Sequence, residues 1–349
     1  MRLRRLLLLA ALVSLLGGCA TLRYYAQAVS GQLELLRRAT PIDEELARDA
    51  VPAELKAKLR AVLRIRAFAS RELGLPDNGS YKSYADLGRR YAVWNVFAAP
   101  EFSIDPVTSC FPIAGCVSYR GYFAEADAAA EGAALRERGY DVFIGGVPAY
   151  STLGWFDDPV LNTFIRYPEA ELARLMFHEL AHQQLYVKDD TRFNESFAAT
   201  VEQAGVERWL AQNGDDGQRA AYLRLQDMRR DFIALLIKYR VLLQQYYRQG
   251  LAPEEMRLGK AQRFAEMEEA YRQLKVSWGG FAGFDRWFGG KPNNATLASV
   301  ALYTELVPAF RALLEREGGD LPRFYSAVKQ LASLPRDERN ARLQSLTSN

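Results

Sequence analysis

The sequence predicts an α+β protein in which a small β-rich part precedes a larger helical body. Short β-branched and aromatic runs, punctuated by glycine and proline, are confined to about residues 91–160. From Pro168 onward, apolar residues recur at helical spacing. The 349 residues are 49% hydrophobic and 25% charged, as in a globular protein with one large core or two modest ones.

The N-terminus has the form of a bacterial export signal. Three arginines among the first five residues precede an apolar run over residues 6–16, which is too short to span a bilayer but suits a signal-peptide core. The run ends in Gly17-Gly18-Cys19, which resembles a lipobox. We therefore expect residues 1–18 to be a lipoprotein signal peptide and the thiol of Cys19 to be lipidated. The alternative is a plain secretory signal or an N-terminal membrane anchor.

Export determines the expected location and partners of the chain. A lipid anchor would hold it in the bacterial cell envelope, at the periplasmic face of the outer membrane. The whole chain has a net charge of +3, and the signal peptide removes three arginines and no acid, so the mature chain carries 3 − 3 = 0. A neutral protein has no electrostatic attraction for nucleic acid, which we exclude as a partner.

Two further cysteines, Cys110 and Cys116, form an even pair that closes a short loop. In an oxidising periplasm they could form a disulfide. The alternative is a pair of buried free thiols, and the sequence does not choose between the two.

The periodicities also predict the order of elements. We expect an N-terminal helical segment at 19–90, the β-rich part at 91–160 and a helical metal-site and C-terminal part at 161–349, with 19–349 forming one catalytic unit. The expected strands are 92–97, 117–123 and 141–147, with a helix at 124–138 and an edge or extension strand at 149–154. The expected later helices are 169–186, 192–212, 217–248, 253–275, 295–316 and 321–331, with a loop at 277–294 and a polar tail at the end.

The strongest local signal is the HExxH motif, His178-Glu179-Leu180-Ala181-His182. Helical residues at i and i+4 lie on one face, so His178 and His182 can bind one metal ion, while Glu179 can approach a water on that metal. The alternative is a chance occurrence on an amphipathic helix. Against it, the chain has only these two histidines, and the motif has apolar flanks, where unpaired polar groups would be costly. We expect one Zn²⁺ per chain.

A catalytic zinc needs a third protein ligand, and no third histidine exists. Glu195, early in the next predicted helix, is the first candidate because the polar break at residues 189–191 would let that helix fold back. Glu202 is the alternative. It lies roughly 10 Å further along the helix at 1.5 Å per residue, so the two glutamates cannot both bind the same ion.

The stretch HELAHQ followed by NESFA resembles the gluzincin metallopeptidases, whose third ligand is a glutamate on a following helix. Gluzincin aminopeptidases with a similar N-E-G-F-A segment have a longer spacer and a GAMEN motif, whereas this chain has a twelve-residue spacer and no such motif. The chain resembles more closely a family of bacterial lipoproteins described as putative aminopeptidases. Supporting stretches are Tyr119–Phe123, Ala149–Phe156, Asn293–Ala295 and Leu306–Phe310. The resemblance implies a mostly helical, gluzincin-like zincin with a small mixed sheet before the HExxH helix.

The expected reaction is hydrolysis of a peptide bond. The metal activates a water, and Glu179 takes its proton and passes it to the leaving amine. The developing oxyanion needs another donor, for which Tyr303 is the first choice and Tyr150 the second. Either tyrosine could instead be a packing residue. The segment 149–154 could align a peptide by strand pairing, or be a core strand only.

The function most consistent with these features is that of a zinc-dependent peptidase with peptide substrates, in particular an aminopeptidase. An aminopeptidase needs an acidic anchor for the free amine, and Glu202, Asp157 and Asp158 are among the candidates. The alternative is a non-catalytic envelope lipoprotein with a structural metal or a peptide-binding role. The intact Glu179 argues against it, because a structural metal site has no use for a general base.

Overall fold

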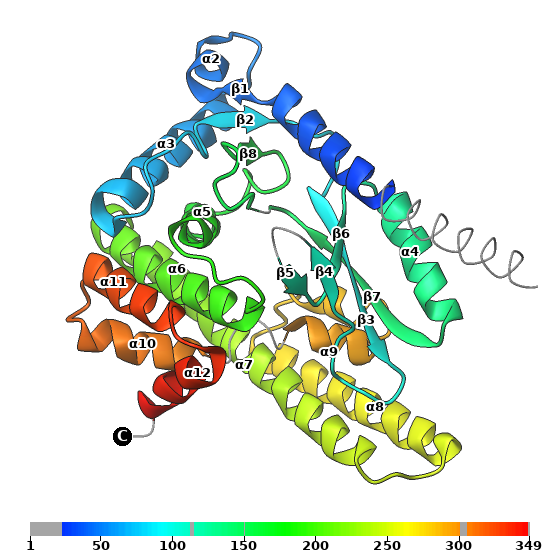
Figure 1. Ribbon diagram of the computed structural model, residues 1–349. Helices are drawn as coiled ribbons and strands as arrows, with labels where there is room; N and C mark the ends of the chain where they lie inside the picture. Colours follow the sequence, from blue (N-terminus) through cyan, green and yellow to red (C-terminus); the bar gives the residue numbers. More distant parts are fainter. Residues whose placement is uncertain (1–22, 112–114, 150, 301–305, 348–349) are drawn as a thin grey trace, which may run out of the picture.

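The computed structural model describes residues 23–111, 115–149, 151–300 and 306–347. It confirms the α+β class, since helices dominate and the strands form small sheets (Figure 1). The predicted lipidation site Cys19 and the predicted oxyanion donors Tyr150 and Tyr303 lie outside the described residues. Within the described ranges, no helix combines the length and the apolar character that crossing a membrane requires.

A short three-stranded sheet, which the sequence did not predict, follows the N-terminal helical residues 23–38. Its order is β1-β2-β8, with β1 antiparallel and β8 parallel to the central strand. The elements of this region are β1 (Thr40–Pro41), α2 (Ile42–Ala47), α3 (Ala53–Leu73), β2 (Ser83–Ala85) and β8 (Val160–Leu161). Strands of two or three residues show no alternation that could predict them.

The second sheet has the order β6-β3-β7 and is antiparallel throughout. It contains β3 (Val93–Pro100), β6 (Arg120–Tyr122) and β7 (Tyr140–Val147), and the predicted helix between two strands is α4 (Glu125–Glu137). Along β3, Trp94, Val96 and Ala98 pack with Ala128 and Leu135 of α4. The intervening residues of β3 therefore point to the opposite face of the sheet.

Two strand predictions are wrong in detail. The expected strand 117–123 is divided between a hairpin, β4 (Ser109–Phe111) with β5 (Gly115–Val117), and the separate strand β6. The expected strand 149–154 is not a strand in its described residues, 149 and 151–154. Leu153 and Gly154 have φ values of 56° and 80°, and Asp158 accepts hydrogen bonds from the backbone and hydroxyl of Thr152, so the chain turns there.

The HExxH helix α5 (Glu169–Gln184) lies near the centre of the molecule, beside α6 (Thr191–Asn213) (Figure 1). Asp190 caps α6 by accepting from the backbone N–H of Phe193. The connection is closed by Asn194, whose side chain pairs with both the N–H and the C=O of Val187 at 2.7 Å. The fold-back predicted at residues 189–191 therefore occurs.

The remaining helices form two groups around this pair (Figure 1). The long helices α7 (Asp216–Tyr247) and α8 (Pro253–Ser277) form a hairpin, followed by the 3₁₀ turn η1 (Asp285–Trp287) and α9 (Asn294–Val300). The C-terminal helices are α10 (Val307–Arg316), α11 (Leu321–Ala332) and α12 (Arg336–Ser345). The main core extends from Leu35 to Leu343 and includes both α5 and α6.

Two helix predictions need correction here. The single helix expected at 295–316 is two helices, α9 and α10, on either side of residues 301–305, which are outside the description. Pro308 stands in the first turn of α10, where its missing N–H costs nothing. The expected polar tail contains α12, which is held by Leu343 in the core and by Arg339, buried in an ion pair with Asp190.

Candidate metal-binding active site

Helix α5 is buried on most of its surface and presents one polar face. Leu175, Met176, Phe177, Leu180 and Ala181 are all 5% exposed or less. The polar face carries the two histidines and the glutamate of the motif, which together line a cavity. The apolar residues hold the helix in the core, and the i, i+4 spacing directs the functional side chains to the same side.

Helix α6 brings Glu195 to both histidines. The Nε2 atoms of His178 and His182 are 3.2 Å apart. The carboxylate oxygens of Glu195 lie 3.2 Å from Nε2 of His178 and 3.7 Å from Nε2 of His182. Tetrahedral bonds of 2.0–2.1 Å would place the ligand atoms about 3.3–3.4 Å apart. These three side chains therefore have the spacing and the donor types to hold a zinc ion.

Glu202, the alternative ligand, lies on the other side of His178. Its Oε2 is 2.9 Å from Nδ1 of that histidine, whereas Glu195 faces Nε2. A carboxylate at Nδ1 holds the proton there and leaves Nε2 free as a ligand. The tertiary structure thus separates the two glutamates. Glu195 lies at the Nε2 side of His178, next to His182, and Glu202 pairs with the opposite nitrogen, Nδ1.

The support extends into a buried chain of alternating charges. Arg174 donates to Glu202 at 3.0 Å and to Glu171 at 3.0 Å, and Glu171 also pairs with Arg229 of α7 at 2.6 Å. Burial raises the pKa of Glu202, but the Arg174 guanidinium and His178 outweigh it, so the pKa is lowered. Each charge in this chain has an opposite neighbour, which is what makes burial of several ions tolerable.

The pKa shifts of His178 and Glu195 have opposing causes. Burial lowers the pKa of His178, but hydrogen bonds to Glu195 and Glu202 outweigh it and raise the pKa well above its ordinary value. For Glu195, burial raises the pKa, and the two histidines outweigh it, so the pKa is lowered. These shifts favour a proton on His178 beside an ionised Glu195. A divalent ion bound there would take the place of that proton.

Glu179 is partly buried beside this cluster and lines the same cavity. Burial raises its pKa, and the neighbouring histidines His178 and His182 partly oppose that shift. A carboxyl group with a raised pKa can accept a proton and return it, as a general base must. Behind it lies Asp158, whose pKa is raised to about 6, mainly by burial, against the hydrogen bonds from Thr152.

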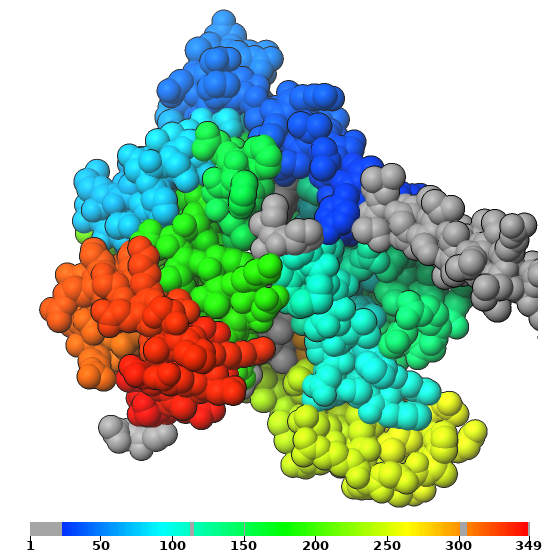
Figure 2. All heavy atoms as spheres, in the orientation of Figure 1, coloured from blue at the N-terminus to red at the C-terminus, as the bar shows by residue number. Residues whose placement is uncertain are grey.

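The cavity has a volume of about 530 Å³ and lies between α5 and the second sheet. Its sheet wall includes Val93 and Asn95 of β3, Gly121 of β6 and Val147 of β7. Tyr24 and Ala28 of the N-terminal helical residues close another side. Figure 2 shows the face of the molecule on which the N-terminal segment (blue), the strands (cyan) and α5–α6 (green) meet.

The N-terminal helical residues also occupy the free edge of β6. The amide of Gln27 donates to the carbonyl of Gly121 and accepts from the N–H of Phe123. Tyr24 stacks on Phe111. Burial raises the pKa of Tyr24, against the Arg120 guanidinium and a hydrogen bond from the Gly121 backbone. The backbone groups that a paired strand would use are therefore already bound at this edge.

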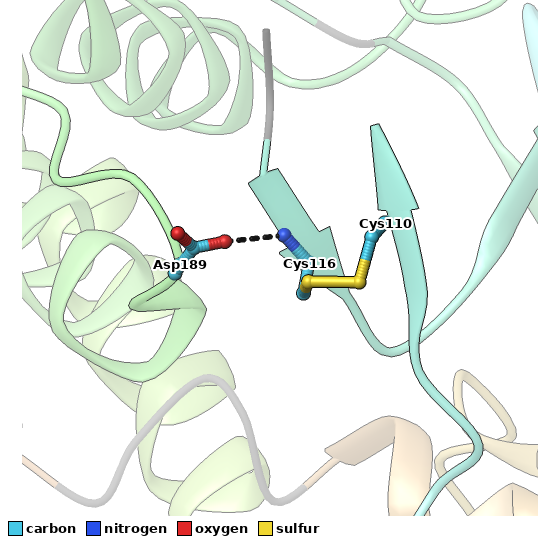
Figure 3. Close-up of a disulfide and its surroundings, with 3 residues drawn as sticks. All are labelled: Cys110, Cys116 and Asp189. Atoms are coloured by element: carbon cyan, nitrogen blue, oxygen red, sulfur yellow. Dashed lines mark hydrogen bonds between the residues drawn. A yellow bond between two sulfur atoms is a disulfide. The ribbon is translucent and has the colours of Figure 1, made fainter. Parts of the chain in front are cut away.

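The two cysteines form a disulfide that lies close to the turn between α5 and α6 (Figure 3). The backbone N–H of Cys116 donates to the carboxylate of Asp189 at 2.6 Å. Gly115, at φ +74°, lies against the Asp189 side chain, where a Cβ atom would collide with it. The disulfide hairpin thus braces the turn that brings α6 onto α5.

The amine anchors suggested by the sequence are placed elsewhere. Glu202 is paired behind His178, and neither Asp157 nor Asp158 lines the cavity. Among the described residues that line it, the only acids are Glu179 and Glu195.

Two cavity residues were missed at the level of sequence. Tyr119 lines the cavity, and burial raises its pKa, to which the nearby carboxylates Glu195 and Glu179 add. It is one of 18 tyrosines, and although it begins a stretch that supports the family resemblance, nothing in that stretch marks it as a cavity residue. Asn95 is the other, in the middle of a β-branched and aromatic strand. An asparagine inside such a run is the only sequence signal that could have marked it.

Fold and site together define an α+β protein built around a buried HExxH helix, with a glutamate of the following helix placed at metal-ligand spacing from the two histidines. The model of the family described as "Putative aminopeptidase" matches residues 23–343, and the chain belongs to this family. The family description indicates a peptidase. No curated protein and no solved structure matches the chain.

Proposed function

We propose that the protein is a zinc-dependent peptidase that acts as an aminopeptidase. The observation that carries this proposal is the convergence of His178, His182 and Glu195 at metal-ligand spacing, beside the partly buried carboxyl group of Glu179. The family description supports the peptide substrate. The HExxH helix and the glutamate ligand on the next helix support a gluzincin-like type of site.

His178, His182 and Glu195 would hold the ion. Bound there, zinc lowers the pKa of a water molecule and polarises the scissile carbonyl group. Glu179 takes the proton of the attacking water and delivers it to the nitrogen of the leaving amine. Its raised pKa favours this role, because the proton must stay on the carboxyl group between the two transfers. Glu202 keeps the proton of His178 on Nδ1, so that Nε2 remains available.

The oxyanion of the transition state needs a hydrogen-bond donor from the chain. Tyr303 and, after it, Tyr150 stay our candidates from sequence. Tyr119 is a third candidate, since it lines the cavity and its raised pKa keeps the phenol protonated at neutral pH. Replacing each tyrosine by phenylalanine identifies the donor, because the true donor variant keeps its zinc and loses kcat.

The lipobox-like sequence before Cys19 supports a lipid-anchored protein at the periplasmic face of the outer membrane. A disulfide at Cys110 and Cys116 suits that oxidising compartment. Metabolic labelling with a palmitate analogue tests the anchor, and it should label the wild type but not Cys19→Ser.

The decisive experiment measures zinc content and peptide hydrolysis together. We expect about one zinc per chain, hydrolysis of peptides that is abolished by a chelator and restored by zinc, and a preference for free over blocked N-termini. Equal cleavage of blocked peptides would remove the aminopeptidase assignment. A zinc-loaded protein that cleaves nothing in a broad peptide library would support the non-catalytic lipoprotein instead.

A further inference from the structure

Asn95 is a polar side chain on an otherwise apolar wall of the cavity. It stands in the middle of β3, on the face opposite α4, and is only 8% exposed. Its cross-strand neighbours are Gly121 on β6 and Gly145 on β7. Neither paired residue has a side chain to cover the amide of Asn95, which lines the cavity, although the ring of Phe143 lies over Gly145.

The amide of Asn95 is unpaired. In the described parts of the chain, no hydrogen bond joins its side chain to another residue. The residue is only 8% exposed, but its amide atoms are not fully buried and remain accessible from the cavity, where a ligand can pair with them. Asn194, the other asparagine that lines the cavity, behaves differently, because both ends of its amide are bound to the backbone of Val187.

Apart from Tyr119, the remaining side chains of the sheet wall offer no substitute for this amide. Val93 and Val147 flank Asn95 on the same face, and Val117 and Phe123 continue the lining. These side chains can bury a ligand but cannot orient its polar groups.

The strand edge next to Asn95 offers no substitute either. The outward backbone groups of Gly121 and the N–H of Phe123 are bound by Tyr24 and Gln27. A peptide in the cavity therefore cannot pair with those groups as an added strand would. On this side of the cavity, its orientation depends on a side chain.

We propose that Asn95 is a substrate-binding residue whose carboxamide pairs with the backbone of the bound substrate. Its Nδ2 donates to the carbonyl oxygen of one substrate residue, and its Oδ1 accepts from the N–H of the same residue, because these two groups point to the same side of an extended peptide. An asparagine amide has one donor end and one acceptor end, as a peptide group does, so the match favours peptides over esters and simple acids. This assignment rests on the proposed peptidase function and adds the residue that recognises the substrate backbone.

The test replaces Asn95 by leucine, which has a similar size and no polar atoms. Because the amide is unpaired in the free protein, Asn95→Leu should keep or raise the melting temperature. The matched control is Asn194→Leu, which removes an amide that is fully bonded and should lower it. A fall in melting temperature for Asn95→Leu as large as that of the control would show that Asn95 is a structural residue and overturn the proposal.

Binding is measured on zinc-loaded Glu179→Gln protein with a penta-alanine peptide labelled at its C-terminus. Adding Asn95→Leu should weaken binding about tenfold to a hundredfold. The same peptide is then made as a series, in which each member is N-methylated at one peptide group. One member should bind more weakly than the parent peptide to the protein that keeps Asn95. The protein with Asn95→Leu should bind that member as well as it binds the parent, because the contact is already lost. In the active enzymes, KM should rise and kcat should change little.

The outcomes separate this inference from the proposed function. If wild type and Asn95→Leu hydrolyse and bind peptides equally, or if no N-methyl position couples to residue 95, the assignment of Asn95 is wrong and the peptidase stands. If neither protein binds or cleaves the peptide, the proposed function fails and the inference fails with it. If Asn95→Gln binds the peptide and Asn95→Leu does not, the result further supports the carboxamide pairing.

Discussion

The position of Glu202 leads to a sharp prediction about metal affinity. Glu202→Gln keeps an oxygen that can accept from Nδ1 of His178, but it removes the negative charge that lies 2.9 Å from that nitrogen. Loss of such an outer carboxylate typically weakens metal binding about 10- to 100-fold, which corresponds to about 1.4–2.8 kcal/mol. Because both side chains are largely buried, solvent screens this interaction little, and we expect an effect within that range.

The assay is a competition titration of the apo protein with a chromogenic zinc chelator, with circular dichroism to establish that each variant is folded. Glu207→Gln is the control on the same helix, since Glu207 forms only an exposed pair with Arg311 and should leave zinc affinity unchanged. Glu195→Ala should lose zinc far more severely than Glu202→Gln. The reverse order would show that Glu202 is the ligand, and an unchanged affinity in Glu202→Gln would refute its supporting role.

Three further predictions follow from the same structure. Glu179→Gln should retain zinc, measured by elemental analysis, and lose at least about a hundredfold in kcat; full activity would contradict its role as the base. Replacing Cys110 and Cys116 by serine should lower the free energy of unfolding by about 2 kcal/mol for a loop of this size, and reducing agent should lower the melting temperature of the wild type alone. Asp158 has a folded pKa of about 6 against an ordinary 3.8, so its protonated form is favoured in the fold. The protonated carboxyl group therefore contributes to the free energy of unfolding below about pH 4, and this contribution is lost as the pH rises through about 6. Asp158→Asn should match the wild type in stability at pH 4 and exceed it by about 3 kcal/mol at pH 8. Urea titrations at the two pH values measure the difference.

Periodicity predicted the long elements well and the short ones poorly. The helices α5 and α6 and the strands β3 and β7 were expected near their observed positions, because each shows several repeats of its own period. The strands of the first sheet have two or three residues and show no period. Helix α12 was missed because only Arg339 and Leu343 are buried in it, so its polar sequence resembles a tail.

The segment 149–154 shows how a local pattern can mislead. Its alternation suggested a strand, but no neighbouring strand takes up its described residues, and the hydrogen bonds from Thr152 to Asp158 favour a turn instead. Strand propensity expresses the fit to a pleated neighbour, so it has little weight where the fold provides none.

The sequence alone determined the two histidines and the base of the candidate site, because the i, i+4 spacing of a helix is a local property that places them on one face. It also named Glu195 and Glu202 as the rivals for the third position. Only the tertiary structure placed Glu195 at Nε2 and Glu202 at Nδ1 of His178, because the Asn194 turn and the disulfide hairpin decide how α6 crosses α5. Only the tertiary structure likewise shows that the amide of Asn95 is unpaired. Its surroundings are formed by three strands and by the N-terminal helical residues, which are distant in the sequence.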